Sequence, residues 1–316
     1  MEPCMPAIIT HDQFGKQALS LSSVLFIKTK EEKDAFLLGN QGPDPFFYCG
    51  VDPSLLKYRF VGNMIHDKKP AELFFALSKH LKKVPMEYHS IVKAYVAGFA
   101  CHYLLDRSAH PYVYSQQYAF CKAGEEGLTD KDGSDVHAVI ESELDEMMLY
   151  TRTGQTVATY APEKEILRCS TKPLKAISAY LASVIREVYS ADVRDDLFYR
   201  GVVLFRLVQG VFHSPRGIKR NLLGNIERLL RNHSFVQAMS HRAIPLTVSE
   251  FDNHQHAVWE NPFTGTVTTA SFVDLFNQAQ QEANDTLPML FGDNFSLEEA
   301  KEFTRGQNFS GKFVEE

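Results

Sequence analysis

Apolar residues recur at helical spacing along most of the chain. Between residues 89 and 108 they form a stripe at every third or fourth position, which is typical of an amphipathic helix packed on a core. The same pattern predicts helices over residues 14–27, 70–82, 135–150, 173–189, 195–209, 216–232 and 271–283. Strand-like patterns occur only within residues 244–270, in IPLTVSEF and GTVTTA. The chain is therefore predicted to be all-α.

Two stretches depart from this helical pattern. Residues 34–70 are rich in glycine, proline and aromatic residues (AFLLGNQGPDPFFYCG), which predicts an ordered loop around short helices. Residues 121–134 (CKAGEEGLTDKDGS) are polar and predict a loop. Neither stretch resembles a low-complexity linker, and no internal repeat is present. We therefore expect one helical domain over residues 1–316.

Composition and charge exclude several classes of protein. The net charge is −6, with 33 basic and 39 acidic residues, which does not favour a protein that binds a nucleic-acid backbone. The five cysteines are widely spaced without a CxxC pair, as expected for reduced thiols in a cytoplasmic protein. The first residues, MEPCMPAIITHDQFG, lack the pattern of a signal peptide. No run of about 18 apolar residues predicts a transmembrane helix.

Two histidine–carboxylate pairs stand on the apolar faces of predicted helices. His102 and Asp106 are four residues apart and so share a helix face, and His137 and Glu141 repeat the spacing. A carboxylate on a buried face is costly unless it is paired or binds a metal ion. His110 follows the first pair, at the helix end that Pro111 marks. Imidazole nitrogens with carboxylate oxygens suit zinc, so the two helices predict a zinc site between them.

Three upstream residues extend this set, namely His11 in ITHDQFG, Asp44 in GNQGPDPFFY and His66 in NMIHDKK. The ordered series His, Asp, His, HxxxD, His, HxxxE resembles the zinc-dependent phospholipase C family, which shares its multi-helix fold with the single-strand-specific zinc nucleases. The resemblance covers residues 6–150, while residues 151–316 would add further helices. The segments GPDPFFY and HYLLDRSAHP look closest to the non-secreted members of that family.

The resemblance implies a cluster of two or three zinc ions. One ion would be held by Asp44, His66, His102 and Asp106. A second would be held by His110, His137 and Glu141. Asp106 would bridge to a third ion, held also by His11. Secreted relatives complete that third site with an N-terminal Trp, whereas the single Trp here is Trp259. A processed N-terminus at Pro6, Cys4 or a backbone carbonyl would replace it, or the third site would be empty.

The resemblance further implies a phosphodiester hydrolase that uses a zinc-activated water. Asp44 would act as general base or orient the water, and Phe46, Phe47 and Tyr48 would line the substrate cleft. The substrate would be a phospholipid or a soluble phosphodiester. Pro45 replaces the Tyr that follows the ligand Asp in the phospholipases, which weakens the case for recognition of a lipid headgroup. The alternatives are a nuclease of the same fold, which the acidic charge disfavours, and a non-enzymatic interaction protein stabilised by metal.

The remaining histidines are expected to have no part in the site. His80 and His89 are predicted to be exposed near helix ends. The other five histidines also lie outside the ligand motif, namely His213, His233, His241, His254 and His256. The basic helix predicted over residues 216–232 is expected to be a solvated face.

Overall fold

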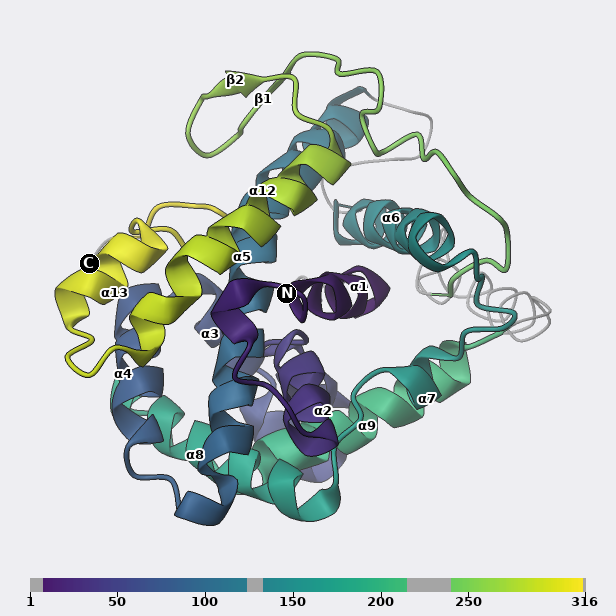
Figure 1. Cartoon of the computed structure of the whole chain (residues 1–316). Coiled ribbons are helices and arrows are strands. Elements are labelled where there is room, and N and C mark those ends of the chain that lie inside the picture. The colour runs from purple at the N-terminus through teal and green to yellow at the C-terminus, as the bar shows by residue number, and fades with distance from the viewer. Residues whose placement is uncertain (1–7, 124–132, 215–239, 315–316) are drawn as a thin grey trace. The chain divides into compact units, whose positions relative to one another are not determined.

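A computed structural model describes residues 8–123, 133–214 and 240–314, and within these ranges the fold is all-α, as predicted (Figure 1). The α-helices are α1 (Ile8–Ala18), α2 (Lys30–Gly39), α3 (Val61–Asp67), α4 (Pro70–Leu81), α5 (Met86–Ala123), α6 (Gly133–Thr153), α7 (Pro162–Glu165), α8 (Thr171–Tyr189), α9 (Leu197–Phe212), α12 (Phe272–Thr286) and α13 (Leu297–Thr304). The 3-10 helices are η1 (Ser22–Val24), η2 (Asp44–Val51), η3 (Pro53–Tyr58) and η5 (Leu287–Phe291). A short antiparallel hairpin pairs β1 (Trp259–Glu260) with β2 (Val267–Thr268).

The chain divides into two compact units, each assembled from three separate stretches. Unit 1 consists of Met1–Gln13, Ala109–Ile166 and Arg206–Leu275. Unit 2 consists of Phe14–Ser108, Leu167–Phe205 and Phe276–Glu316. The organisation of residues 1–316 as a single domain stays a prediction.

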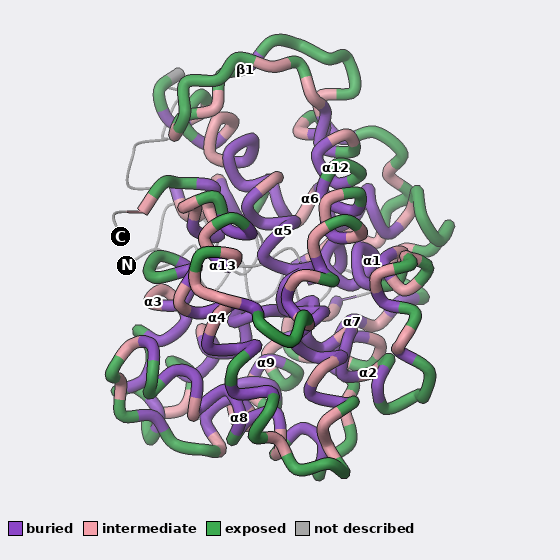
Figure 2. The backbone as a smooth tube through the Cα atoms, turned by 60° about the vertical axis from the view of Figure 1, so that its left-hand side comes forward, coloured by how far each residue is buried: buried purple, intermediate pink, exposed green. Residues whose placement is uncertain are grey.

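The core of unit 2 surrounds the first half of α5, whose buried tube is visible in Figure 2. The ring of Phe74 on α4 packs against Tyr103 of α5 at 4.9 Å and against Phe303 of α13 at 4.8 Å. Helix α2 crosses α5 at two glycines, Gly39 and Gly98. A Cβ on Gly98 would lie 2.0 Å from the carbonyl oxygen of Phe36, so only glycine permits this approach.

Unit 1 is organised around buried acidic residues of α6. Asp145 accepts hydrogen bonds from the backbone N–H groups of Ile9 (3.0 Å) and Thr10 (2.7 Å), which lie in the first turn of α1. The carboxylate therefore caps the positive end of that helix. It also accepts a hydrogen bond of 2.9 Å from Nε2 of His241. Residues distant in sequence thus fix the N-terminus of α1.

We expect the stability that His241 contributes to disappear as the pH rises. Burial alone would lower the pKa of His241, but the hydrogen bond to Asp145 and the charges of Asp145 and Glu146 raise it above its ordinary value. A raised folded-state pKa means that the contribution is complete below about pH 6.5 and is lost above the folded pKa. The His241→Gln substitution should therefore cost about 1.5–3 kcal/mol at pH 6 and much less at pH 9, measured by urea unfolding.

The exposed His254, replaced by Gln in the same way, serves as the control for this pH dependence. It should lower the free energy of unfolding by well under 1 kcal/mol at both pH values. An equal loss for His241→Gln at pH 6 and pH 9 would show that the imidazolium form is not what stabilises unit 1.

Several predicted boundaries differ from the observed ones. The first helix begins at Ile8 and not at residue 14, because Asp145 caps its start. Helix α5 continues through Pro111, which was expected to mark its end. The buried side chains of Tyr112 and Val113 beyond the proline favour the continued helix over a break. The helix predicted over residues 216–232, and His233, lie outside the described residues.

His80 is buried, contrary to the expectation that it would be exposed at a helix end. Its Nε2 donates a hydrogen bond of 2.7 Å to Glu187 of α8, and its Nδ1 lies 2.9 Å from the hydroxyl of Ser183. Hydrogen bonds from Lys79 and His80 lower the pKa of Glu187 to about 2. His80 therefore joins α4 to α8 and is not a solvated residue.

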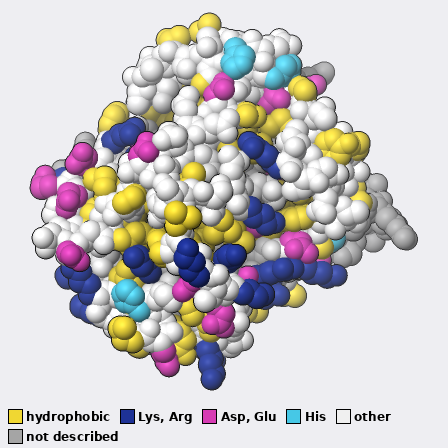
Figure 3. Space-filling model, viewed as in Figure 1, with side chains coloured by type: hydrophobic (Ala, Val, Ile, Leu, Met, Phe, Trp, Pro, Cys, Tyr) yellow, Lys and Arg dark blue, Asp and Glu magenta, His cyan; other side chains and the backbone are white. Residues whose placement is uncertain are grey.

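Apolar side chains reach the face shown in Figure 3 in small groups between polar and charged ones. Such mixing is ordinary for a folded protein. Among the residues that the structure describes, no helix combines the length and the apolar character that crossing a membrane would require.

Candidate metal centres

Unit 2 brings together the four residues predicted to hold the first zinc ion. Asp44 begins η2, His66 lies on α3, and His102 and Asp106 lie on α5. Potential ligand atoms of His66, His102 and Asp106 all lie within 4.8 Å of one another. Oδ1 of Asp44 is 3.2 Å from Nε2 of His66 and 3.8 Å from Nε2 of His102. All four residues are buried.

Backbone carbonyls orient the two imidazoles of this cluster. Nδ1–H of His66 donates to the carbonyl of Gly62 (2.9 Å), and Nδ1–H of His102 donates to the carbonyl of Asn40 (3.1 Å). Since each Nδ1 carries the proton, each Nε2 presents its lone pair toward the carboxylates. This is the arrangement that metal-binding histidines use.

Gly42 makes the orientation of His102 possible. It follows Asn40 in the turn before η2, and its φ of +48° lies in the left-handed region. A Cβ at this position would lie 2.1 Å from Cδ2 of the His102 ring. The glycine therefore allows the turn to approach the imidazole closely enough to accept its hydrogen bond.

Of the three aromatic residues predicted to line a cleft, only Phe47 lies beside the cluster. Its ring is tilted against His66 at 5.1 Å. Phe46 and Tyr48 belong instead to the core, where Phe46 packs on Phe198 and Tyr48 stacks on Phe205. A 3-10 helix repeats every three residues, so Phe47 shares a face with Asp44, whereas its two neighbours turn away.

Phe309 is a part of this site that the sequence did not suggest. Its buried ring lies 4.9 Å from the ring of His66 and 5.8 Å from that of His102. Its backbone N–H donates to the carbonyl of His66 (3.3 Å). The segment around it is polar, and no local pattern marks this residue as a contact of the ligands.

Unit 1 brings together the three residues predicted to hold the second ion. His110 lies on α5, and His137 and Glu141 lie on α6, with potential ligand atoms within 4.8 Å of one another. Oε1 of Glu141 is 3.2 Å from Nε2 of His137 and 3.4 Å from Nε2 of His110. Nδ1–H of His137 donates to Oε1 of Gln117 (2.9 Å), which turns Nε2 toward the carboxylate.

Neighbouring charges shift the pKa of one residue in each cluster, Glu141 in unit 1 and His66 in unit 2. Burial by itself would raise the pKa of Glu141, but His137 and His110 lower it below the ordinary value. Burial by itself would lower the pKa of His66, but the hydrogen bond with Asp44 and the charges of Asp44 and Asp106 raise it. The charged forms of Glu141 and His66 are therefore both favoured by the opposite charges of their neighbours.

Among the predicted ligands, Oδ2 of Asp44, Nε2 of His137 and Oε2 of Glu141 are buried and make no hydrogen bond to the described residues. Buried polar atoms nearly always have a hydrogen-bond partner, so the lack of one here indicates a site for a ligand. Two of these atoms are carboxylate oxygens and the third is an imidazole nitrogen, which are the donors that zinc accepts. The residues present therefore fit zinc.

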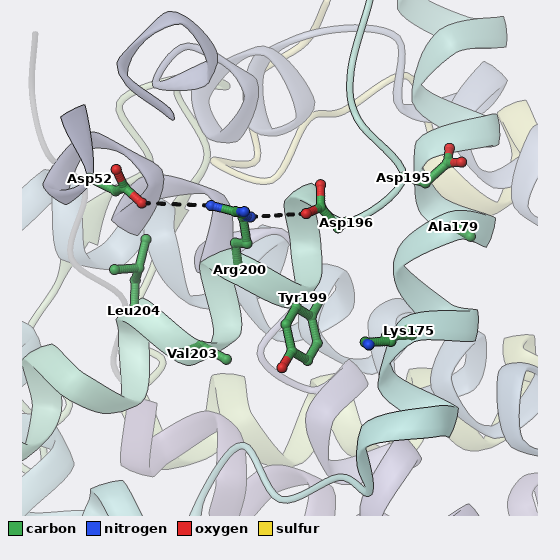
Figure 4. A pocket seen from close by; sticks show the side chains of 9 residues that line it. All are labelled: Asp52, Lys175, Ala179, Asp195, Asp196, Tyr199, Arg200, Val203 and Leu204. Carbon is green, nitrogen blue, oxygen red and sulfur yellow. Dashed lines mark hydrogen bonds and ion pairs between the residues drawn. The ribbon is translucent and has the colours of Figure 1, made fainter. Parts of the chain in front are cut away.

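His11, the remaining predicted ligand, is buried on α1. Its sharing of a third ion with Asp106 stays a prediction, and Cys4 and Pro6 lie outside the described residues. A separate open pocket of about 560 Å³ in unit 2 is lined by residues of η2–η3, α8 and α9, and none of the predicted metal ligands lines it (Figure 4).

Comparison of the chain with protein-family models, with curated proteins and with solved structures finds no match in any of the three.

Proposed function

We propose that this protein is a zinc-dependent phosphoric diester hydrolase of the phospholipase C type. The observation that carries the proposal is the pair of buried clusters, one formed by Asp44, His66, His102 and Asp106 and the other by His110, His137 and Glu141. Each cluster brings residues from two or more helices to within ligand distance of a helical histidine–carboxylate pair. The histidine and carboxylate donors fit zinc, and clustered zinc ions suit phosphoester hydrolysis.

The bound zinc would supply a Lewis acid for the phosphoryl oxygens and would lower the pKa of a water molecule. The chain's own groups have separate tasks. His66 and His102 offer Nε2 because Gly62 and Asn40 hold the opposite nitrogens. Asp44 directs Oδ1 toward the imidazoles and leaves Oδ2 without a hydrogen bond to the described residues, so this oxygen can orient a water. Phe47 and Phe309 restrict water around His66 and strengthen its electrostatic interactions.

Metal content and turnover together test this proposal. Protein reconstituted with zinc should hold two or three ions per chain by elemental analysis. It should hydrolyse a phosphodiester from a panel of phosphatidylcholine, single-stranded DNA and a chromogenic soluble diester. Removal of zinc by a chelator should abolish the activity, and zinc should restore it.

The outcomes of that experiment separate the alternatives. Activity on DNA alone would favour the nuclease. A fully metallated protein that is inactive on all three substrates would favour a metal-stabilised interaction protein. Less than one zinc per chain after reconstitution would contradict the metal centres themselves.

A further inference from the structure

The segment between the predicted ligands Asp44 and His66 carries a group of exposed apolar side chains. Within residues 51–60 (VDPSLLKYRF), the exposed fractions are 55% for Val51, 45% for Leu56 and 46% for Phe60. Lys57 and Arg59, which lie between Leu56 and Phe60 in the sequence, are also exposed. Three large apolar residues and two cations therefore face solvent within one short stretch.

This exposure is not a sign of a loosely packed segment. Leu55 and Tyr58 of η3 are buried, and their spacing of three residues is the repeat of a 3-10 helix, so they anchor one face of it. A Cβ on Gly50 would lie 3.9 Å from Cβ of Arg59, which shows that the two ends of the segment meet. Val51 and Phe60, the residues next to this contact, are thus held at the same end of a fixed surface.

The charge on this surface is positive, although the chain carries a net charge of −6. Its one acidic residue, Asp52, accepts a hydrogen bond from the backbone N–H of Ser54 (2.8 Å) and lies 3.9 Å from the guanidinium of Arg200 (Figure 4). Arg200 also pairs with Asp196 at 2.9 Å, and Arg194 contacts Asp196 at 2.7 Å. The two arginines therefore balance the charges of Asp52 and Asp196. Lys57 and Arg59 remain as the charges that a partner would meet.

We propose that residues 51–60 form a docking surface for the anionic face of a lipid bilayer. Val51, Leu56 and Phe60 enter the interface, and Lys57 and Arg59 contact the lipid phosphates. Apolar side chains combined with Lys and Arg are the pattern of interfacial binding, in which apolar burial and attraction to anionic lipid act together. The positive charges of Lys57 and Arg59 are complementary to the negative charge of anionic lipids, although the protein as a whole is acidic.

The position of this surface links it to the candidate site, because the chain enters it from Asp44 and leaves it toward His66. In that respect the inference rests on the proposed function, since docking would bring lipid phosphodiesters to the ligand-bearing segment. Binding itself requires no turnover, so it can be measured separately.

Vesicle flotation tests the surface. The zinc-loaded wild type should float with phosphatidylcholine vesicles that contain phosphatidylserine and much less with pure phosphatidylcholine, and added salt should weaken binding. Leu56→Ser with Phe60→Ser should lower the partition coefficient about tenfold or more, since two apolar anchors are lost. Lys57→Glu with Arg59→Glu should lower the partition coefficient on anionic vesicles only.

Matched controls carry the same changes elsewhere. Met86 and Val258 are 88% and 71% exposed, so replacing both by Ser tests loss of apolar surface alone. Lys33→Glu with Lys83→Glu, at two exposed lysines, tests the change in net charge. Each control pair should change the partition coefficient less than about twofold.

Two results would overturn the docking surface: a wild type that binds neither kind of vesicle, or control pairs that lose as much binding as the segment variants. Circular dichroism checks that each variant is folded. If a variant is unfolded, the binding of the wild type to the two kinds of vesicle still tests the docking surface. Turnover of a soluble phosphodiester distinguishes the two proposals. Vesicle binding without any hydrolysis would contradict only the proposed function. Hydrolysis without vesicle binding would contradict only the docking surface.

Discussion

Replacement of Asp106 by Asn is expected to lower zinc content by at least one ion per chain and phosphodiester turnover by about a hundredfold or more. Oδ2 of Asp106 lies 3.1 Å from Nε2 of His102 and 3.9 Å from Nε2 of His66. An amide at this position has the same shape but brings no negative charge to the cluster. The loss should be visible in elemental analysis and in hydrolysis of a chromogenic diester.

The matched control for this substitution is Asp192→Asn. Asp192 is exposed in the loop between α8 and α9, so the identical chemical change should leave zinc content and turnover within about twofold of wild type. His89→Ala, outside the ligand set, should be equally mild. An Asp106→Asn protein that retains full metal and the wild-type rate would rule out Asp106 as a ligand.

Replacement of Gly98 by Ala is expected to destabilise unit 2 by about 3 kcal/mol or more. The new methyl group would lie 2.0 Å from the Phe36 carbonyl oxygen, and both atoms belong to packed helices that cannot yield locally. Separation of α2 from α5 would also shift the turn at Asn40, which orients His102. Urea unfolding should therefore show the loss of stability, and zinc affinity should fall with it.

Gly210→Ala provides the comparison, since Gly210 also lies within a helix. The nearest neighbour of a Cβ there is Cγ of Glu163 at 3.6 Å, an ordinary contact. Alanine should stabilise α9 by up to about 1 kcal/mol through its better helix propensity. If Gly98→Ala matched Gly210→Ala in stability, the close approach of α2 and α5 would not be a real constraint.

The sequence predicted those elements whose formation depends on local pattern. Helix α8 was expected over residues 173–189 and is observed at Thr171–Tyr189, and α4 was expected over 70–82 and is observed at Pro70–Leu81. Their apolar stripes and nearby turn residues lie within one stretch of chain. His102 also lies beside Asp106, and His137 beside Glu141, because HxxxD and HxxxE spacing fixes a shared helix face without knowledge of the rest of the fold.

The predictions that failed concern residues whose structure depends on partners distant in the chain. The start of α1 is fixed by Asp145, and its own sequence gives no strong cap. The roles of Phe46 and Tyr48 could not be separated from that of Phe47 without knowing that η2 is a 3-10 helix. The burial of His80 follows from Glu187 and Ser183 on α8, a contact that periodicity within α4 cannot indicate.

The place of Phe309 against His66 and His102 has a consequence for the protein during its synthesis. Domains fold as their chain emerges from the ribosome, and the residues of the first cluster, from Asp44 to Asp106, emerge long before Phe309 does. Until then the two imidazoles lack the ring that packs against them. The nascent chain thus passes through an interval in which all four residues of the first cluster have been made, but the ring that packs on two of them has not.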